Sequence, residues 1–181
     1  MTTVLIASNN AHKQVGVSSD PVEDAETFLG NARIKAHAAQ QASGGMPVLA
    51  DDSGLEVDAL DGAPGVHSAR YAGEPCDDAA NNAKLLDALS DVADEARTAR
   101  FVCQLVFLDE NGNEVDARGT VEGRIAHEAH GENGFGYDPL FLPEVFGFER
   151  SLGEAKPEEK NAVSHRGNAL RELRAKLSGT C

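Results

Sequence analysis

Residues 48–73 have the sequence VLADDSGLEVDALDGAPGVHSARYAG, and the prediction of the fold starts from this stretch. Its opening apolar run predicts the end of a buried strand, and Asp51 and Asp52 follow directly. The serine–glycine pair that comes next predicts a turn, and the alternation of residues 55–60 predicts a second, half-buried strand. Two carboxylates beside such a turn suit a divalent metal or a positioned water, and they are equally typical of a solvated hairpin tip.

The length and the apolar pattern limit the classes to which the protein can belong. A chain of 181 residues predicts a single domain, residues 1–181, with a core of its own. We expect no membrane segment, because no apolar run approaches the length of a spanning helix, and no signal peptide, because the N-terminus MTTVLIASNN lacks a basic region and a long apolar region. The three cysteines have no metal-ligand spacing, which favours free thiols and a cytoplasmic location.

The charge balance excludes one class of partner. The chain has 30 acidic and 16 basic residues, a formal net charge of −14, whereas nucleic-acid polymers bind positively charged surfaces. Only six of the basic residues are lysines. A surface rich in acidic residues and poor in lysine favours a halophilic type of protein, because concentrated salt screens the repulsion among its charges.

The N-terminal segment offers a candidate phosphate loop. Residues 3–7 are continuously apolar and predict a central strand, which small polar residues and a lysine follow. Such residues after a strand either cradle phosphate oxygens or form an ordinary strand-to-helix loop, and the glycines of a P-loop are absent. The candidate residues are Ser8, Asn9, Asn10, Ala11, His12 and Lys13.

Helices and strands alternate along the rest of the chain. Thr27 is expected to cap a helix over 28–42, and the glycine pair after Ser43 is expected to end it. Further expected elements are a helix over 77–91, strands over 98–108 and 115–126 joined by a hairpin turn, a short strand over 140–143, and a final helix that opens at Ser164.

Two later segments suit a ligand. In residues 131–139, GENGFGYDP, glycines flank a Phe and a Tyr that either stack on a base or belong to the core. The run Ser164-His165-Arg166 either forms an anion site at a helix start or supplies a plain N-cap.

Five motifs in order resemble those of the inosine triphosphate pyrophosphatase family: SNNAHK (8–13), ETFLGNARIKA (26–36), residues 48–73, GENGFGYDP (131–139) and KNAVSHR (160–166). The resemblance implies an α/β fold, an elongated mixed β-sheet with flanking helices, and two lobes with a central cleft. It implies a homodimer that uses Mg²⁺ to hydrolyse non-canonical purine nucleoside triphosphates (ITP, dITP, XTP) to the monophosphate and pyrophosphate. Such an enzyme cleanses the nucleotide pool.

The same resemblance assigns roles by motif. It implies that Asp52 is the catalytic residue and, with Glu23, a metal ligand. Residues 8–13, Lys35 and Ser53 correspond to phosphate or substrate contacts. The base-pocket residues would be Phe135, Gly136, Tyr137 and Asp138, and the remaining substrate contacts Lys160, His165 and Arg166. Three of the six lysines fall in these motifs, which favours a local positive pocket in an acidic chain.

The main departure from the family lies between Lys13 and Glu23, where only residues 14–22 stand in place of the usual helix and strand. Such shortening leaves open an alternative, a nucleotide-binding protein with little or no turnover. A related pyrophosphatase of modified pyrimidine nucleotides is a lesser alternative, against which the SHR and GFGYDP segments argue.

Overall fold

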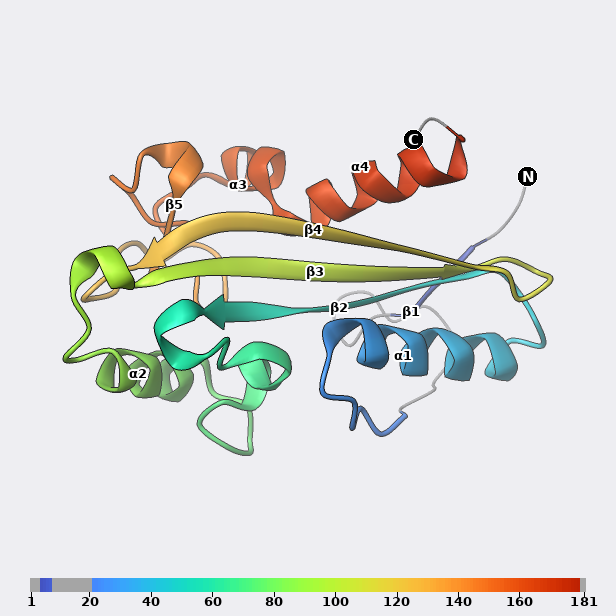
Figure 1. The fold of residues 1–181 in the computed structure, drawn as a ribbon, viewed down its shortest axis with the longest axis horizontal. Helices are drawn as coiled ribbons and strands as arrows, with labels where there is room; N and C mark the ends of the chain where they lie inside the picture. Colours follow the sequence, from blue (N-terminus) through green and yellow to red (C-terminus); the bar gives the residue numbers. More distant parts are fainter. Residues whose placement is uncertain (1–3, 8–20, 180–181) are drawn as a thin grey trace. The chain divides into compact units, whose positions relative to one another are not determined.

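The computed structural model describes residues 4–7 and 21–179, and over these residues the chain is a mixed α/β protein. In this described part of the chain, five strands form one sheet in the order β1-β2-β3-β4-β5, with helices beside it (Figure 1). The strands are β1 (Leu5–Ala7), β2 (Val48–Val57), β3 (Thr98–Leu108), β4 (Glu114–Ile125) and β5 (Phe141–Pro143). The α-helices are α1 (Phe28–Ala42), α2 (Asp78–Ala88), α3 (Pro157–Val163) and α4 (His165–Leu177). Short 3₁₀ segments cover Asp58–Leu60, Gly65–Arg70, Asp94–Ala96 and Glu144–Phe146. The predicted mixed sheet with flanking helices is confirmed.

The sheet contains both parallel and antiparallel neighbours. Strand β1 runs parallel to β2, with Leu5 opposite Val48, and β5 runs antiparallel to β4, with Gly123 opposite Pro143. Between β3 and β4 the predicted hairpin turn is present, because Asp109 Oδ1 accepts the backbone N–H groups of residues 111 and 113, each at 2.8 Å. A Cβ at position 123 would lie 2.5 Å from the Phe141 ring, so the close approach of β5 explains this glycine.

The chain divides into two compact units. The first contains residues 1–53, 103–119 and 168–181, and the second contains residues 54–102 and 120–167. Strands β2, β3 and β4 therefore each contribute residues to both units.

The core of the first unit has helices on both faces of the sheet. Alanines of α1 pack against Val48 and Ala50 of β2 and Val106 of β3. Alternate residues of β3, Cys103 and Leu105, pack instead against α4. Because successive strand residues point to opposite faces, β3 is buried on both sides here.

The second unit has one larger core. Leu55 and Val57 of β2 meet leucines of α2 and the aromatic residues Phe101 and Phe141, whose ring centroids lie 4.6 Å apart. At its margin, the fully buried guanidinium of Arg97 donates to three backbone carbonyls, those of Leu89, Ile125 and Ala126, at 2.7–2.8 Å.

Two sequence expectations about the strands are wrong. Strand β2 is continuous through the predicted turn, so Asp51 and Asp52 lie within a strand and not at a hairpin tip. The buried positions change from even numbers, 48 and 50, to odd numbers, 55 and 57, where the chain passes from one unit to the other. That change of phase produces the pattern of two strands and a turn.

The second error concerns the first strand. Strand β1 lies at the edge of the sheet over the described residues and not at its centre, and Ile6 is 54% exposed.

Helix α2 is also shorter than expected and ends at Ala88. No helix in the described part of the chain has the length and apolar character needed to cross a membrane.

Candidate active site

The first unit contains a carboxylate–lysine cluster, Glu23, Lys35 and Asp52. Lys35 occupies the buried face of α1, where the burial pattern repeats every three or four residues. Asp52 has an even number, like Val48 and Ala50, and so lies on the same face of β2 as these two residues, which pack on α1. The periods of the helix and the strand therefore direct the two side chains toward each other.

The cluster is closely bonded. Lys35 is 5% exposed, and its Nζ lies 2.8 Å from Asp52 Oδ1 and 2.9 Å from Glu23 Oε2. Asn31, one turn earlier on the same helix face, accepts the backbone N–H of Ala25 at 3.0 Å. This bond ties the segment that contains Glu23 to α1, a role that the sequence reasoning missed. The signal was available, since Asn31 is a polar residue at a buried position of the helix period.

Burial and the neighbouring opposite charges shift the pKa values of Lys35 and Asp52 in opposite directions. Burial raises the pKa of Asp52 above its ordinary value, and the neighbouring Lys35 ammonium reduces that rise without reversing it. Burial lowers the pKa of Lys35, but the Asp52 carboxylate, with Glu23, more than offsets this, so the net shift is upward. A buried carboxylate with a raised pKa is a better proton acceptor than a solvated one.

The cluster fits a metal that is shared with a substrate. Asp52 Oδ2 is buried and has no hydrogen-bond partner among the described residues. The described residues contain no group of three or more His, Cys, Asp or Glu side chains that could hold a metal. Mg²⁺ commonly takes one or two carboxylates and completes its shell with phosphate oxygens and water, so Glu23 and Asp52 suit that requirement.

The second unit contains the glycine-rich loop, residues 131–139. Its two aromatic residues have different environments: Phe135 is 60% exposed, whereas Tyr137 is buried and its hydroxyl donates to the Ser68 carbonyl at 2.8 Å. Burial raises the pKa of Tyr137 above its ordinary value. The loop thus presents one aromatic ring to solvent and places the other in the core.

Asp138 organises the loop from inside. It is buried, and its Oδ2 accepts the backbone N–H of Phe135 at 2.7 Å and forms an ion pair with Lys160 of α3. Lys160 Nζ also lies 4.4 Å from the centroid of the Phe135 ring. Only glycine fits at position 134, where φ is +84° and a Cβ would lie 2.2 Å from Asp138 Oδ2.

The segment before α4 uses its serine as a cap. Ser164 Oγ accepts the backbone N–H of Gly167 at 3.0 Å, as the N-cap alternative predicts. The His165 ring stacks on Phe101, with centroids 5.1 Å apart and planes 16° apart. Both His165 and Arg166 are half-buried.

Several predicted site residues cannot be compared with the structure. Ser8, Asn9, Asn10, Ala11, His12 and Lys13 lie outside the described residues, as does most of the short 14–22 segment. Ser53 lies in β2 beside Asp52 and is partly exposed.

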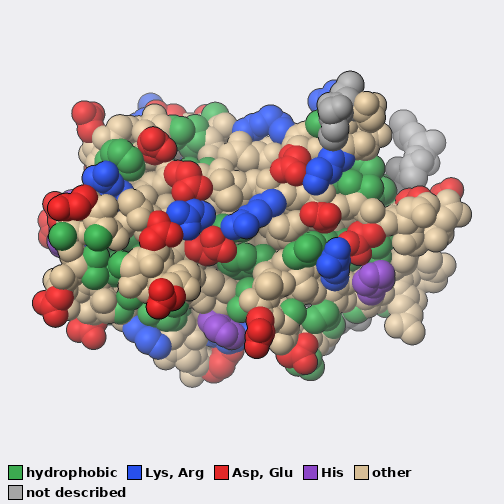
Figure 2. All heavy atoms as spheres, viewed as in Figure 1, with side chains coloured by type: hydrophobic (Ala, Val, Ile, Leu, Met, Phe, Trp, Pro, Cys, Tyr) green, Lys and Arg blue, Asp and Glu red, His purple; other side chains and the backbone are tan. Residues whose placement is uncertain are grey.

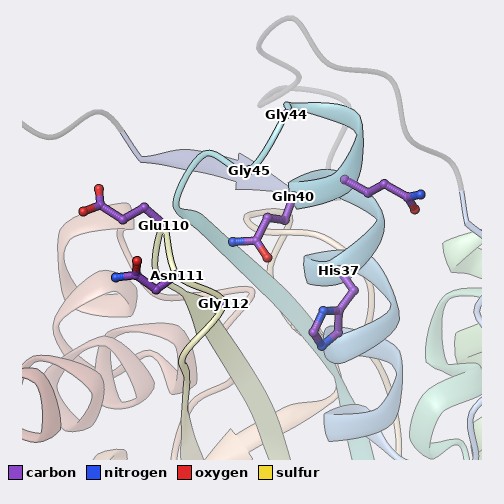
Figure 3. Close-up of a pocket in the computed structure, with 8 residues that line it drawn as sticks. His37, Gln40, Gly44, Gly45, Glu110, Asn111 and Gly112 are labelled. Carbon is purple, nitrogen blue, oxygen red and sulfur yellow. The ribbon is translucent and has the colours of Figure 1, made fainter.

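Two hollows lie away from all these residues. An open one of about 530 Å³ in the first unit is lined by the end of α1 and the β3–β4 turn (Figure 3). There Gln40 Nε2 donates to the Asp109 carbonyl at 2.7 Å. The other, about 350 Å³, lies in the second unit beside Arg97 and Arg124.

The fold and the side chains define an α/β protein with a buried carboxylate–lysine cluster and a glycine-rich aromatic loop. The model of the Ham1 family matches residues 3–176, and the chain belongs to this family. Among curated relatives, the dITP/XTP pyrophosphatase of Cutibacterium acnes is 45% identical over 194 residues, covering 96% of this chain and 95% of its own. That of Clostridium perfringens is 40% identical, with coverages of 99% and 98%.

Solved structures agree with this assignment. A HAM1 protein from Coxiella burnetii has a TM-score of 0.87 at 39% identity and covers 99% of this chain and 100% of its own. The Staphylococcus aureus Ham1 protein has a TM-score of 0.86 at 38% identity, with coverages of 98% and 99%. The C. acnes alignment is longer than the 181 residues of this chain, so that relative has residues with no counterpart here.

Proposed function

We propose that this protein is a dITP/XTP pyrophosphatase, which hydrolyses dITP, ITP and XTP to the nucleoside monophosphate and pyrophosphate. The observation that carries the proposal is the buried cluster in which Lys35 joins Glu23 and Asp52. Membership of the Ham1 family and similarity to dITP/XTP pyrophosphatases over nearly the whole chain support it.

The proposed reaction is attack of water on the α-phosphorus. A new P–O bond forms to the water oxygen, the bond from the α-phosphorus to the bridging oxygen breaks, and pyrophosphate leaves with the electron pair. Asp52 is the proposed acceptor of the water proton, at Oδ2. Its burial and raised pKa support that role.

Glu23 and Asp52 would hold the divalent metal, for which we propose Mg²⁺. A bound Mg²⁺ would neutralise phosphate charge and orient phosphate oxygens. Lys35 contributes a fixed positive charge to the same cluster, held by its two carboxylates before any substrate arrives. We also assign phosphate contacts to the 8–13 segment and a substrate contact to Ser53.

The glycine-rich loop is the proposed base-binding element. The exposed Phe135 ring can stack on a purine, and Gly136, Tyr137 and Asp138 give the loop its shape. Lys160 and Arg166 would supply positive charge, and His165 a ring nitrogen for hydrogen bonding, from α3 and the start of α4. Oxygen 6 of hypoxanthine or xanthine accepts hydrogen bonds where adenine presents a donor, so a donor-lined site selects the former.

Pyrophosphate release from dITP, ITP, XTP, GTP and ATP, with and without MgCl₂, tests this function. We expect rapid release from the first three and much less from GTP and ATP. Nucleotide binding without release of pyrophosphate from any nucleotide would instead support the alternative of a binding protein. We further propose a homodimer, for which light scattering should give twice the 19.1 kDa chain mass.

A further inference from the structure

Helix α2 bonds both backbone polar groups of Gly136, the residue between the exposed and the buried aromatic of the glycine-rich loop. Asp78 Oδ2 accepts the Gly136 N–H at 2.7 Å, and Asn82 Nδ2 donates to the Gly136 carbonyl at 3.0 Å. The two side chains are four residues apart and therefore lie on one face of the helix. All three residues belong to the second unit.

The helix that supplies these bonds is itself well anchored. Asp77 caps its N-terminus through the N–H groups of residues 79 and 80. Leu85 is fully buried in the core of the second unit, and the buried Asn81 bonds the backbone of residues 69 and 72. Asp78 and Asn82 thus project from a fixed support.

Gly136 has no side chain whose packing could hold its backbone in place. Its φ is +61°, and a Cβ built there would meet no atom within 4 Å. Glycine also has the largest conformational freedom to lose. Asn82 Oδ1 is buried without a partner among the described residues, an arrangement that costs stability.

We propose that Asp78 and Asn82 are positioning residues that fix the glycine-rich loop in the shape that selects the purine base. The inference rests on the proposed function, because it takes this loop as the base-binding element. Neither side chain is required to touch the nucleotide. Both act by fixing the peptide groups on the two sides of Gly136. These peptide groups in turn determine the direction in which the Phe135 side chain points.

Four variants test the proposal: Asp78→Ala, Asn82→Ala, Asp78→Asn and Asp87→Ala. The first two each remove one bond to Gly136, and Asp78→Asn keeps an oxygen that can accept the Gly136 N–H. Asp87 is exposed near the other end of α2, so its alanine variant is a matched control for loss of an acidic side chain. The measurements are steady-state kinetics with dITP and dATP, binding of inosine and adenosine 5′-monophosphates by calorimetry, and melting temperature.

We expect the two bond-deleting variants to raise KM for dITP about tenfold, with kcat within about twofold, and to lower the preference for dITP over dATP about tenfold. Asp78→Asn and Asp87→Ala should resemble the wild type. Wild-type KM and selectivity in both bond-deleting variants would overturn the proposal. So would an equal loss of selectivity in Asp78→Asn.

The two proposals fail in distinguishable ways. A wild type that prefers inosine to adenosine monophosphate but releases no pyrophosphate would reject the proposed reaction. The ratio of the two monophosphate affinities in the variants would then still decide the role of Asp78 and Asn82. A wild type that shows no preference for the inosine base, either in hydrolysis of dITP over dATP or in monophosphate binding, would overturn the positioning role.

Discussion

Lys35 is a charged residue at a buried position of α1. Most of its neighbours on the buried face of α1 are alanines, and it remains charged because two carboxylates lie within 3 Å of its ammonium. A buried ion pair contributes little net stability, since desolvation offsets the attraction. A lysine in such a place is therefore better explained by chemistry than by packing.

The role of Asp52 leads to the first prediction. Asp52→Asn removes the proposed proton acceptor but keeps the size of the side chain, so kcat for dITP should fall by at least about 100-fold while nucleotide affinity changes little. Pyrophosphate release and calorimetric binding measure the two effects. Asp51→Asn, one residue earlier in β2, is the control and should retain most activity. A near-native rate for Asp52→Asn would remove Asp52 from the chemistry.

Lys160 leads to a different expectation. Its ammonium lies beside both Asp138 and the Phe135 ring, so Lys160→Ala should remove the proposed substrate charge contact and loosen the loop. KM for dITP should rise about tenfold or more, with a smaller change in kcat. The control is Lys156→Ala, an exposed lysine just before the same helix. An unchanged KM, or a fall in kcat alone, would contradict the assignment of Lys160 to binding.

At the scale of elements, the sequence predicts most of the fold because its periodic patterns are clear. Helix α1 and strand β3 have the predicted bounds, and Thr27 Oγ1 accepts the Gly30 N–H as the cap predicts. The continuity of β2 was missed because its buried side changes between Ala50 and Leu55. The edge position of β1 was missed because an apolar run of a few residues carries no information about its neighbours.

For the candidate site, the sequence identifies candidate residues but not their environments or their partners. Motifs single out Asp52, Lys35 and Phe135, but a motif does not distinguish the exposed Phe135 from the buried Tyr137 two residues later. Nor does sequence alone pair Gly136 with Asp78 and Asn82, which lie more than fifty residues earlier. Such pairings depend on how α2 packs, and local patterns do not contain that information.

The contact between the 58–60 segment and β3 gives a prediction about pH. The hydrogen bonds from Arg100, with a further one from Thr98, lower the pKa of Asp58 below its ordinary value. A lowered pKa means that the ionised group stabilises the fold above the unfolded-state value of about 3.9, and that this stability is lost as pH falls through the folded-state value. The side chain is 44% exposed, so the contribution should be about 0.5–1 kcal/mol.

Urea unfolding of the wild type and Asp58→Asn at pH 7, 5 and 3 measures this contribution. The difference in free energy of unfolding should be largest at pH 7 and shrink toward pH 3. Asp87→Asn, which changes an exposed carboxylate on α2, should show a smaller difference. A difference between the wild type and Asp58→Asn that stays constant or grows as pH falls would contradict the expected linkage.

At the scale of the whole molecule, the net charge of −14 means that repulsion among acidic side chains exceeds their attraction to basic ones. On the face drawn in Figure 2, many acidic side chains lie among fewer basic ones. Because the Debye length falls from about 10 Å at 0.1 M salt to about 3 Å at 1 M, concentrated KCl should screen the excess repulsion. The melting temperature should therefore rise by roughly 5 °C or more between 0.05 and 2 M KCl. Equal melting temperatures at the two concentrations would reject the halophilic interpretation.

Arg97 has a consequence for proton linkage that differs from that of Asp58. Its guanidinium bonds three backbone carbonyls, and neither arginine nor a peptide carbonyl exchanges a proton between pH 3 and 10. These three hydrogen bonds therefore involve the same number of bound protons in the folded and unfolded chain, so they drop out of the slope of stability against pH. A pH titration of unfolding reports on side chains such as Asp58, whereas the three bonds from Arg97 to the backbone contribute equally at every pH in that range.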